Sequence, residues 1–135
     1  MSIESRIVDS DIVDFTIVND GESTISILEK ISVKRLFMVE VNQSEERGEH
    51  AHKGCAQWIS VLRGQIRVTL KDSYSSTSHK LTNDGKFLYV PPGIWASQSY
   101  STKAIALVLC DQTFNEADYI RDWEEYLNYK KGRIN

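Results

Sequence analysis

The sequence predicts an all-β domain, a small sandwich or barrel, that carries one helix at its C-terminal end. Short segments rich in β-branched and aromatic residues recur along most of the 135 residues, and turn residues separate them. Asp20-Gly21 and Pro91-Pro92-Gly93 are the clearest turn signals. Only the last segment changes to a helical spacing of apolar residues. A chain of this length is the size of one domain, so we expect residues 1–135 to form a single domain.

Each expected strand is a short run of alternating or continuous apolar residues. Ile66, Val68 and Leu70 alternate with polar residues and therefore share one face of their strand. The continuous apolar run at 104–110 is typical of a fully buried strand. Between the strands, the polar runs 43–47 and 71–78 are expected to be loops. The expected strands are residues 12–18, 24–28, 32–41, 56–62, 65–70, 87–90 and 104–110.

The C-terminal segment predicts a helix from about residue 116 to residue 130. Asn115 suits the N-cap position, and acidic residues follow it in the first turn, where the helix dipole favours them. Ile120, Trp123 and Leu127 have the i, i+3, i+7 spacing of an apolar stripe. This stripe is expected to pack on the sheet.

Composition excludes several classes of protein. The chain has 41% hydrophobic and 26% charged residues, as an ordinary globular protein does. A formal net charge of −3 argues against a nucleic-acid partner, and no apolar run approaches the roughly 20 residues of a membrane span. Without an export signal the cytoplasm is the expected location. Cys55 and Cys110 are therefore expected to be buried free thiols rather than a disulfide.

The segment Arg47-Gly48-Glu49-His50-Ala51-His52-Lys53 carries the strongest chemical signal. In an extended strand His50 and His52 point to the same face, where two imidazoles can form a metal site or an acid/base site. Arg47 beside them can bind an anion such as a phosphate. Arg35 and Arg67 are further cationic candidates, and Arg67 lies on the strand face opposite Ile66, so it could point into a cavity. The alternative for each arginine is a solvent-exposed position.

The spacing around the two histidines resembles the paired motifs of the cupin superfamily, whose fold is a double-sheet jelly roll. Gln57 and Gly64 follow His50 and His52 in the order of the first motif, and the second motif leads to Ala96. Metal-binding cupins carry a glutamate and a third histidine where this chain has Gln57 and Ala96. Tight zinc or iron sites normally need at least three protein ligands, so we expect a site without metal or other cofactor. His79 is expected to be a solvated surface residue.

Residues 47–53 also resemble the RG-x-HAHK signature of the nucleotide-sugar 3,4-ketoisomerases, the WxcM-like family of the RmlC-like cupins. The resemblance covers about residues 31–127 and implies a jelly roll with a C-terminal helix. It also implies an enzyme that moves the carbonyl of a dTDP-4-keto-6-deoxyhexose from C4 to C3 through an enediol, for amino sugars of bacterial surface glycans such as the lipopolysaccharide O-antigen. The further matching segments are residues 33–35, 64–68, 89–95 and 118–122.

The resemblance also implies roles for individual residues. His52 is expected to be the principal base, and His50 to polarise an oxygen or to carry the second proton. Arg47, with Arg35 and Arg67, is expected to bind the pyrophosphate or the nucleotide. Gln57 and Trp95 are expected to line the same pocket, in a protein that forms a homodimer.

Two other functions fit the same sequence. The first is epimerisation at C3 and C5 of the same class of substrate, although no tyrosine is clearly matched to the acid of such an enzyme. The second is a non-catalytic cupin that binds a nucleotide sugar, because Ala96 can neither donate nor accept a proton. Ala96 also leaves open the configuration of the product at C4, whose proton could come from His50, Tyr100 or water.

Overall fold

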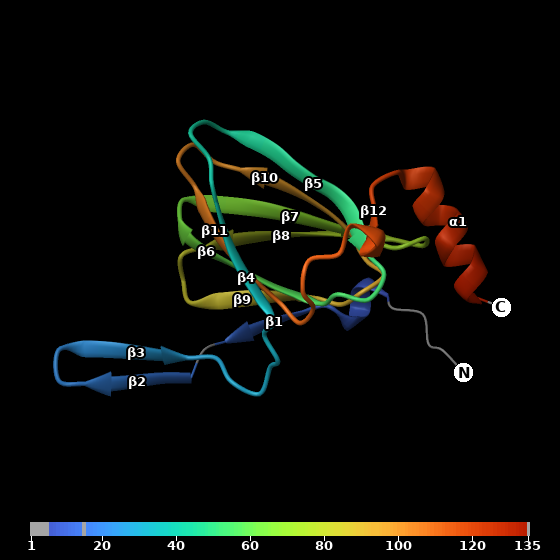
Figure 1. Ribbon diagram of the computed structural model, residues 1–135. Coiled ribbons are helices and arrows are strands. Elements are labelled where there is room, and N and C mark those ends of the chain that lie inside the picture. Colours follow the sequence, from blue (N-terminus) through green and yellow to red (C-terminus); the bar gives the residue numbers. More distant parts are fainter. Residues whose placement is uncertain (1–5, 15, 135) are drawn as a thin grey trace.

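A computed structural model describes residues 6–14 and 16–134 of the chain. Two antiparallel sheets face each other and form a jelly roll, and one helix lies at the C-terminal end (Figure 1). The prediction of a β-rich jelly roll with a terminal helix is confirmed. The strands are β1 (Asp11–Asp14), β2 (Thr16–Asp20), β3 (Ser23–Ile27), β4 (Arg35–Glu40), β5 (Glu45–His52), β6 (Gln57–Arg63), β7 (Gln65–Lys71), β8 (Ser76–Thr82), β9 (Lys86–Val90), β10 (Trp95–Tyr100), β11 (Ile105–Cys110) and β12 (Tyr119–Ile120); the helix α1 is Trp123–Ile134, and short 3-10 turns are Ile7–Asp9 (η1) and Glu116–Asp118 (η2).

The two sheets enclose the main core. One sheet has the strand order β1-β9-β6-β11-β4 and the other has the order β12-β5-β10-β7-β8. Strands β2 and β3 form a separate hairpin that projects from the sandwich (Figure 1). The inward side chains of β7, Ile66, Val68 and Leu70, are completely buried, as the alternation predicted. Strand β11 is buried at alternate positions on its inner face and is paired on both sides.

A bulge in β5 decides which side chains reach the inner face next to the histidines. Ala96 of β10 pairs with His50 and the next residue, Ser97, pairs with Gly48, so Glu49 is an extra residue in the ladder. Gly48 and Glu49 both have positive φ angles, 89° and 61°. One extra residue shifts the alternation, so Arg47 comes to the same side as His50 and His52.

Several of the expected elements differ from the structure. Residues 45–47, expected as part of a loop, begin β5, and β10 lies where no strand was expected. Residues 76–82, expected in part as a loop, form the edge strand β8, which pairs with β7 from Gln65 to Lys71. An edge strand with one solvated face carries polar residues, so its composition resembles that of a loop. The helix begins at Trp123 and not near residue 116, because Tyr119 and Ile120 pair with β5 instead. Asn115 caps the 3-10 turn η2, as its side chain accepts a hydrogen bond from the Ala117 backbone at 3.1 Å.

Helix α1 packs against the outside of the sheet that contains β5 and β10. Its buried stripe contains Tyr126 and Lys130 together with the partly buried Trp123. The Tyr126 hydroxyl and the Lys130 ammonium both donate to the Gly93 carbonyl, at 2.8 and 2.9 Å. These contacts tie the helix to the turn that precedes β10.

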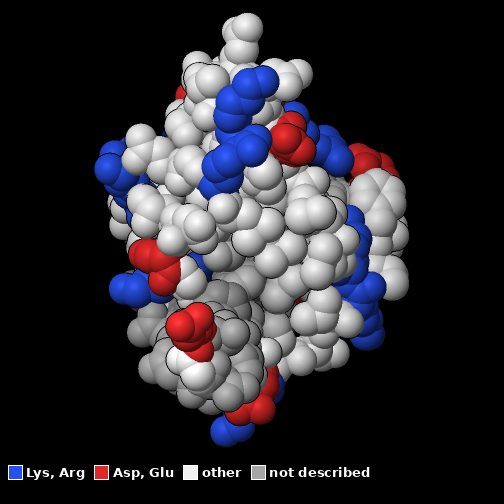
Figure 2. Space-filling view, turned by 90° about the vertical axis from the view of Figure 1, so that its left-hand side faces the viewer, with Lys and Arg blue, Asp and Glu red and all other residues white. Residues whose placement is uncertain are grey.

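Several surface features bear on the expected partners. On the face shown in Figure 2, acidic and basic side chains are interspersed among uncharged ones. None of the helices in the described ranges is both long enough and apolar enough to span a bilayer. Cys55 and Cys110 are both buried and not disulfide-bonded, as expected.

Candidate active site

A cavity of about 190 Å³ opens between the two sheets beside the paired histidines. It is lined by apolar side chains on one wall and by polar and cationic side chains on the other, a composition typical of a small-ligand site. The segment that includes η2 and β12 closes one side. The lining residues are Phe37, Val39, Arg47, Gly48, His50, Gln57, Gln98, Tyr100, Val108, Tyr119 and Arg121.

The two histidines lie on the inner face of β5, as predicted. Their ring centroids are 5.0 Å apart in an edge-to-face arrangement, and Tyr119 contacts both rings at 5.2 and 4.3 Å. His50 lines the cavity, whereas the buried His52 lies directly behind the cavity surface. Burial, together with repulsion from His52, lowers the pKa of His50 to about 4. His50 is therefore a neutral imidazole at physiological pH.

His52 has a carboxylate partner, Asp118, whereas no carboxylate of the described residues is hydrogen-bonded to His50. His52 Nδ1 lies 3.0 Å from Asp118 Oδ2, and the Gly54 backbone N–H donates to Asp118 Oδ1 at 2.6 Å. A carboxylate only accepts hydrogen bonds, so the proton is on Nδ1 and Nε2 carries the lone pair. Nε2 is buried and has no hydrogen-bond partner among the described residues. Burial lowers the pKa of His52, while the hydrogen bond and the charge of Asp118 act in the opposite direction.

Cationic side chains lie at the rim of the cavity. Arg47 is half exposed, and its nearest carboxylate, Glu45, is 3.5 Å away. Arg121 lies over the ring of Tyr119, with its guanidinium 4.3 Å from the ring centroid, and donates twice to Glu116 at 2.9 and 3.1 Å. Both guanidinium groups are accessible to an anion that enters the cavity.

Arg35 lies behind the cavity wall. It donates from Nη1 to the Tyr119 hydroxyl at 3.4 Å and is not itself a lining residue. Its position orients Tyr119 and adds positive charge close to His52.

Gln57 and Tyr100 are neutral donors on the cavity wall. Gln57, at the position where metal-binding cupins carry a glutamate, donates from its amide to Cys110 Sγ at 3.6 Å. The Tyr100 hydroxyl donates to Gln98 Oε1 at 2.9 Å. Burial raises the pKa of Tyr100 to about 12, so its hydroxyl keeps its proton. Ala96, at the position of the missing third histidine, is buried opposite His50.

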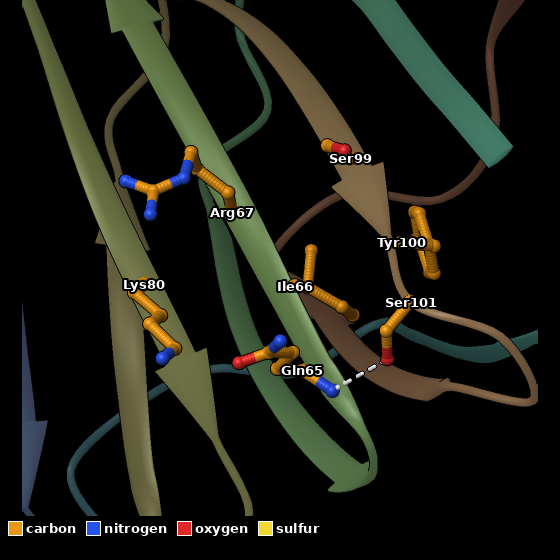
Figure 3. Close-up of a pocket in the computed structure, with 7 residues that line it drawn as sticks. All are labelled: Gln65, Ile66, Arg67, Lys80, Ser99, Tyr100 and Ser101. Atoms are coloured by element: carbon orange, nitrogen blue, oxygen red, sulfur yellow. Dashed lines mark hydrogen bonds between the residues drawn. The ribbon is translucent and has the colours of Figure 1, made fainter. Parts of the chain in front are cut away.

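Two of the residues expected at the site lie elsewhere. Arg67 is exposed on the outer face of β7, opposite Lys80 of β8, where both line a separate hollow of about 220 Å³ (Figure 3). Trp95 points to the other side of β10 and packs against Trp123 and Tyr126 beneath the helix, with centroid distances of 5.3 and 5.6 Å. The structure does not bring either side chain to the cavity.

Sequence reasoning missed three residues of the site, Asp118, Tyr119 and Arg121. The capping signal at Asn115 predicts that their segment forms the first turns of the terminal helix. The available signal was alternation, because Tyr119 and Arg121 share one face of an extended segment while Ile120 is buried on the other. In the structure Tyr119 pairs with His52 across the β12–β5 ladder.

Comparison with known proteins agrees with this architecture. A 3,4-ketoisomerase from Helicobacter canadensis has a TM-score of 0.84 and 28% identity over 91% of this chain and 98% of its own. QdtA from Thermoanaerobacterium thermosaccharolyticum, a sugar 3,4-ketoisomerase solved with TDP, has a TM-score of 0.84 and 23% identity over 96% and 100%. A dTDP-4-dehydrorhamnose 3,5-epimerase from Elizabethkingia anophelis is more distant, with a TM-score of 0.70 and 18% identity over 87% and 76%.

Sequence comparison identifies the family. The curated TDP-4-oxo-6-deoxy-alpha-D-glucose-3,4-oxoisomerase of Aneurinibacillus thermoaerophilus is 28% identical over 129 residues, which cover 90% of this chain and 93% of that protein. The family model described as FdtA, WxcM-like, C-terminal, matches residues 8–131. The chain belongs to the WxcM-like family.

Proposed function

We propose that this protein is a 3,4-ketoisomerase that converts a dTDP-4-keto-6-deoxyglucose into the corresponding 3-keto-6-deoxyhexose. The observation that carries the proposal is the His52–Asp118 pair, which lies beside a cavity with a second, neutral imidazole and cationic groups at its rim. Both named functions of the similar proteins, oxoisomerase and ketoisomerase, are consistent with it.

The base of the reaction is His52. Asp118 holds the proton on Nδ1, so Nε2 presents the lone pair that takes the proton from C3 of the sugar. The imidazolium that forms is stabilised by the same carboxylate. Removal of the C3 proton and protonation of the C4 oxygen give an enediol. Return of a proton to C4, with loss of the proton from the C3 hydroxyl, leaves the ketone at C3 and the composition unchanged.

The remaining cavity residues stabilise the charge that develops on the oxygen atoms. The Gln57 amide donates one N–H to Cys110 and has a second N–H, and such a donor stabilises an enediolate best when it is held in place before the reaction. His50, which lines the cavity and stays neutral, relays the second proton. The pyrophosphate of the substrate binds at Arg47, and Arg121 is a second guanidinium that lines the same cavity.

The experiment supplies dTDP-4-keto-6-deoxyglucose to the protein in deuterated water and follows it by NMR. We expect a 3-keto sugar with deuterium at C4. Label at C3 and C5 with inverted centres would show an epimerase instead. Binding of dTDP without any exchange would show a nucleotide-sugar-binding protein that is not an enzyme. Each outcome selects one of the three functions.

We further propose a homodimer. The outer face of the β4 sheet exposes Leu36, Met38 and Leu62, which are 57%, 62% and 43% accessible, and β4 is an edge strand. A partner subunit that covers this face would bury these side chains. The projecting β2–β3 hairpin of each subunit would then reach the edge strand of the other subunit. Light scattering is expected to give a dimer that Met38→Lys dissociates and that Tyr74→Lys, at a residue 60% exposed outside the sheets, leaves intact.

The cellular context follows from the chemistry of the product. A 3-keto sugar is the substrate that an aminotransferase needs, so the product supplies 3-amino-3,6-dideoxyhexoses for bacterial surface glycans. Reduced, buried Cys55 and Cys110 suit the cytoplasm, where we propose that the reaction takes place. Detection of the aminated sugar in cells, and its loss when the chain is deleted, tests this role.

A further inference from the structure

Three side chains of zinc-ligand type converge behind the cavity, next to the turn that follows β5. One donor atom each of His52, Cys55 and Asp118 lies within 4.8 Å of the other two. The backbone holds them there, because Lys53 N–H donates to the Asp118 carbonyl at 2.8 Å and Gly54 N–H donates to Asp118 Oδ1 at 2.6 Å. Asp118 Oδ2 and His52 Nδ1 are already 3.0 Å apart.

We propose that His52, Cys55 and Asp118 form a zinc site whose occupation inhibits the enzyme. Imidazole, thiolate and carboxylate are the three protein ligands that Zn²⁺ prefers, and a water molecule completes a tetrahedral shell. With bonds of about 2.0–2.3 Å, tetrahedral ligand atoms stand about 3.3–3.8 Å apart. The three atoms lie within 4.8 Å of one another, so they need to close by about 1.5 Å at most. The distance between His52 Nδ1 and Asp118 Oδ2 is already 3.0 Å and needs no closure.

This site differs from the metal position of the cupin motif. There the ligands would come from His50, His52, Gln57 and the residue at 96, which is an alanine here, so only His52 is common to the two sites. The proposed site instead uses Nδ1 of His52 on the side away from the cavity. The metal enters from the surface at Asp118, whose side chain is 17% exposed, beside the exposed Gly54.

Occupation of this site would remove the base. The neutral imidazole carries one ring proton, and Asp118 keeps this proton on Nδ1 while Nε2 holds the lone pair. When Zn²⁺ takes the lone pair of Nδ1, the ring proton moves to Nε2, which then can only donate. Cys55 binds as a thiolate and releases its proton to solvent, so each zinc ion bound releases one proton. Because zinc binding releases this proton, zinc binding weakens as the pH falls.

The metal site can be tested without any assay of turnover. Co²⁺ replaces Zn²⁺ in such sites, and a cobalt–thiolate bond gives a charge-transfer band in the near ultraviolet. Titration of the wild-type chain with Co²⁺ is expected to give this band with one equivalent bound, and competition with a chelator measures the affinity for zinc. Absence of the band in the folded wild-type protein would overturn the proposal, whatever the behaviour of the variants.

A pair of variants then identifies the ligand. Cys55→Ser, or Cys55→Ala if the serine variant is unstable, is expected to lose the band and at least tenfold in zinc affinity. Cys110→Ala is the matched control, because Cys110 is equally buried and is not one of the three residues, and it should keep the band. Retention of the band in the Cys55 variants would refute the assignment.

The inhibitory effect rests on the proposed isomerase function, whereas the metal site does not. Zinc is expected to abolish turnover of the wild type, and a chelator to restore it. Cys55→Ser should keep the basal rate and need at least ten times more zinc for the same inhibition. Zinc that binds through Cys55 with unchanged turnover would refute the inhibitory role. A protein that shows the cobalt band but no ketoisomerase activity would refute the proposed function alone.

Discussion

Replacement of Asp118 by asparagine tests the proposed base most directly. Gly54 N–H donates to Asp118 Oδ1, and an asparagine oxygen can keep this hydrogen bond. The asparagine amide then faces His52 Nδ1, 3.0 Å away, with its N–H donors. Nδ1 must accept from this amide, so the ring proton moves to Nε2 and the lone pair that removes the C3 proton is lost.

The expected effect is on kcat. A correctly placed general base contributes on the order of 100- to 10,000-fold, so Asp118→Asn should lower kcat by about this factor, or about 3–5 kcal/mol in activation free energy. The pKa of His52 should also fall, because Asp118 is the group that opposes the lowering by burial. The assay follows formation of the 3-keto sugar by NMR, and dTDP binding, measured by calorimetry, should stay unchanged.

Asp111→Asn is the matched control for this substitution. Asp111 Oδ1 accepts a hydrogen bond from the Ala56 backbone at 2.9 Å, much as Asp118 does from Gly54, but Asp111 is not hydrogen-bonded to a histidine within residues 6–14 and 16–134. Its replacement should leave kcat within about threefold of the wild-type value, which corresponds to less than about 1 kcal/mol. If Asp118→Asn also stayed within this limit, the assignment of His52 and Asp118 as a base and its orienting carboxylate would be refuted.

Three further predictions follow from the same geometry. Arg47→Ala should raise KM for the nucleotide sugar by about 10- to 100-fold with little change in kcat, since a charged hydrogen bond is worth about 1.5–3 kcal/mol. Arg67→Ala, on the outer face, should change neither constant. Equal effects of the two substitutions would contradict the assignment of Arg47 as the residue that binds the pyrophosphate. The pKa of His50 is lowered to about 4 by burial and by His52, so the folded state binds fewer protons than the unfolded chain between that pH and about 6.5. Urea unfolding should therefore show stability that is complete above pH 6.5 and falls by up to about 3 kcal/mol towards pH 4, and His50→Gln should flatten this dependence. Gly48→Ala should lower the free energy of unfolding by about 1–3 kcal/mol, because Gly48 has φ 89° and an added Cβ would lie 3.2 Å from Ser97 Cα. Gly21→Ala, with φ 64° and no atom within 4 Å of the added Cβ, should lower it by less. A larger loss for Gly21→Ala than for Gly48→Ala would refute the argument from close packing.

Much of the fold could be predicted because hydrophobic alternation reports directly which face is buried. Ile66, Val68 and Leu70 identify the inner face of β7, and the same rule places His50 and His52 together. Applied strictly, that rule also puts Arg67 on the outer face, because it alternates with three completely buried residues. We expected Arg67 to reach a cavity because it lies on the face opposite Ile66. The face of Ile66 is the one buried between the two sheets, however, so the opposite face, with Arg67, is exposed. That the chain forms one domain stays a prediction.

The position of Arg47 could not be predicted from alternation alone. In a regular strand Arg47 would point away from His50, and only the extra residue at Glu49 brings both to the cavity. The bulge depends on Gly48 fitting against the backbone of β10, a contact between residues far apart in sequence. The predicted start of the helix, near residue 116, was wrong for a similar reason. Residues 116–122 have helical features, but pairing of Tyr119 and Ile120 with β5 overrides this local preference.

The segment 118–121, whose role in the site was not predicted, makes the environments of the two histidines different. Without a metal, two imidazoles 5.0 Å apart in a buried site would both be poor bases, because burial lowers both pKa values and His52 lowers that of His50 further. Asp118 is hydrogen-bonded to His52, and no such carboxylate bond is recorded for His50 among the described residues. One histidine thus keeps a higher affinity for a proton while its neighbour stays neutral. A separation of proton affinities between adjacent groups is what assigns the roles of base and relay. The chemistry at the paired histidines therefore depends as much on the distant residue Asp118 as on the HxH motif itself.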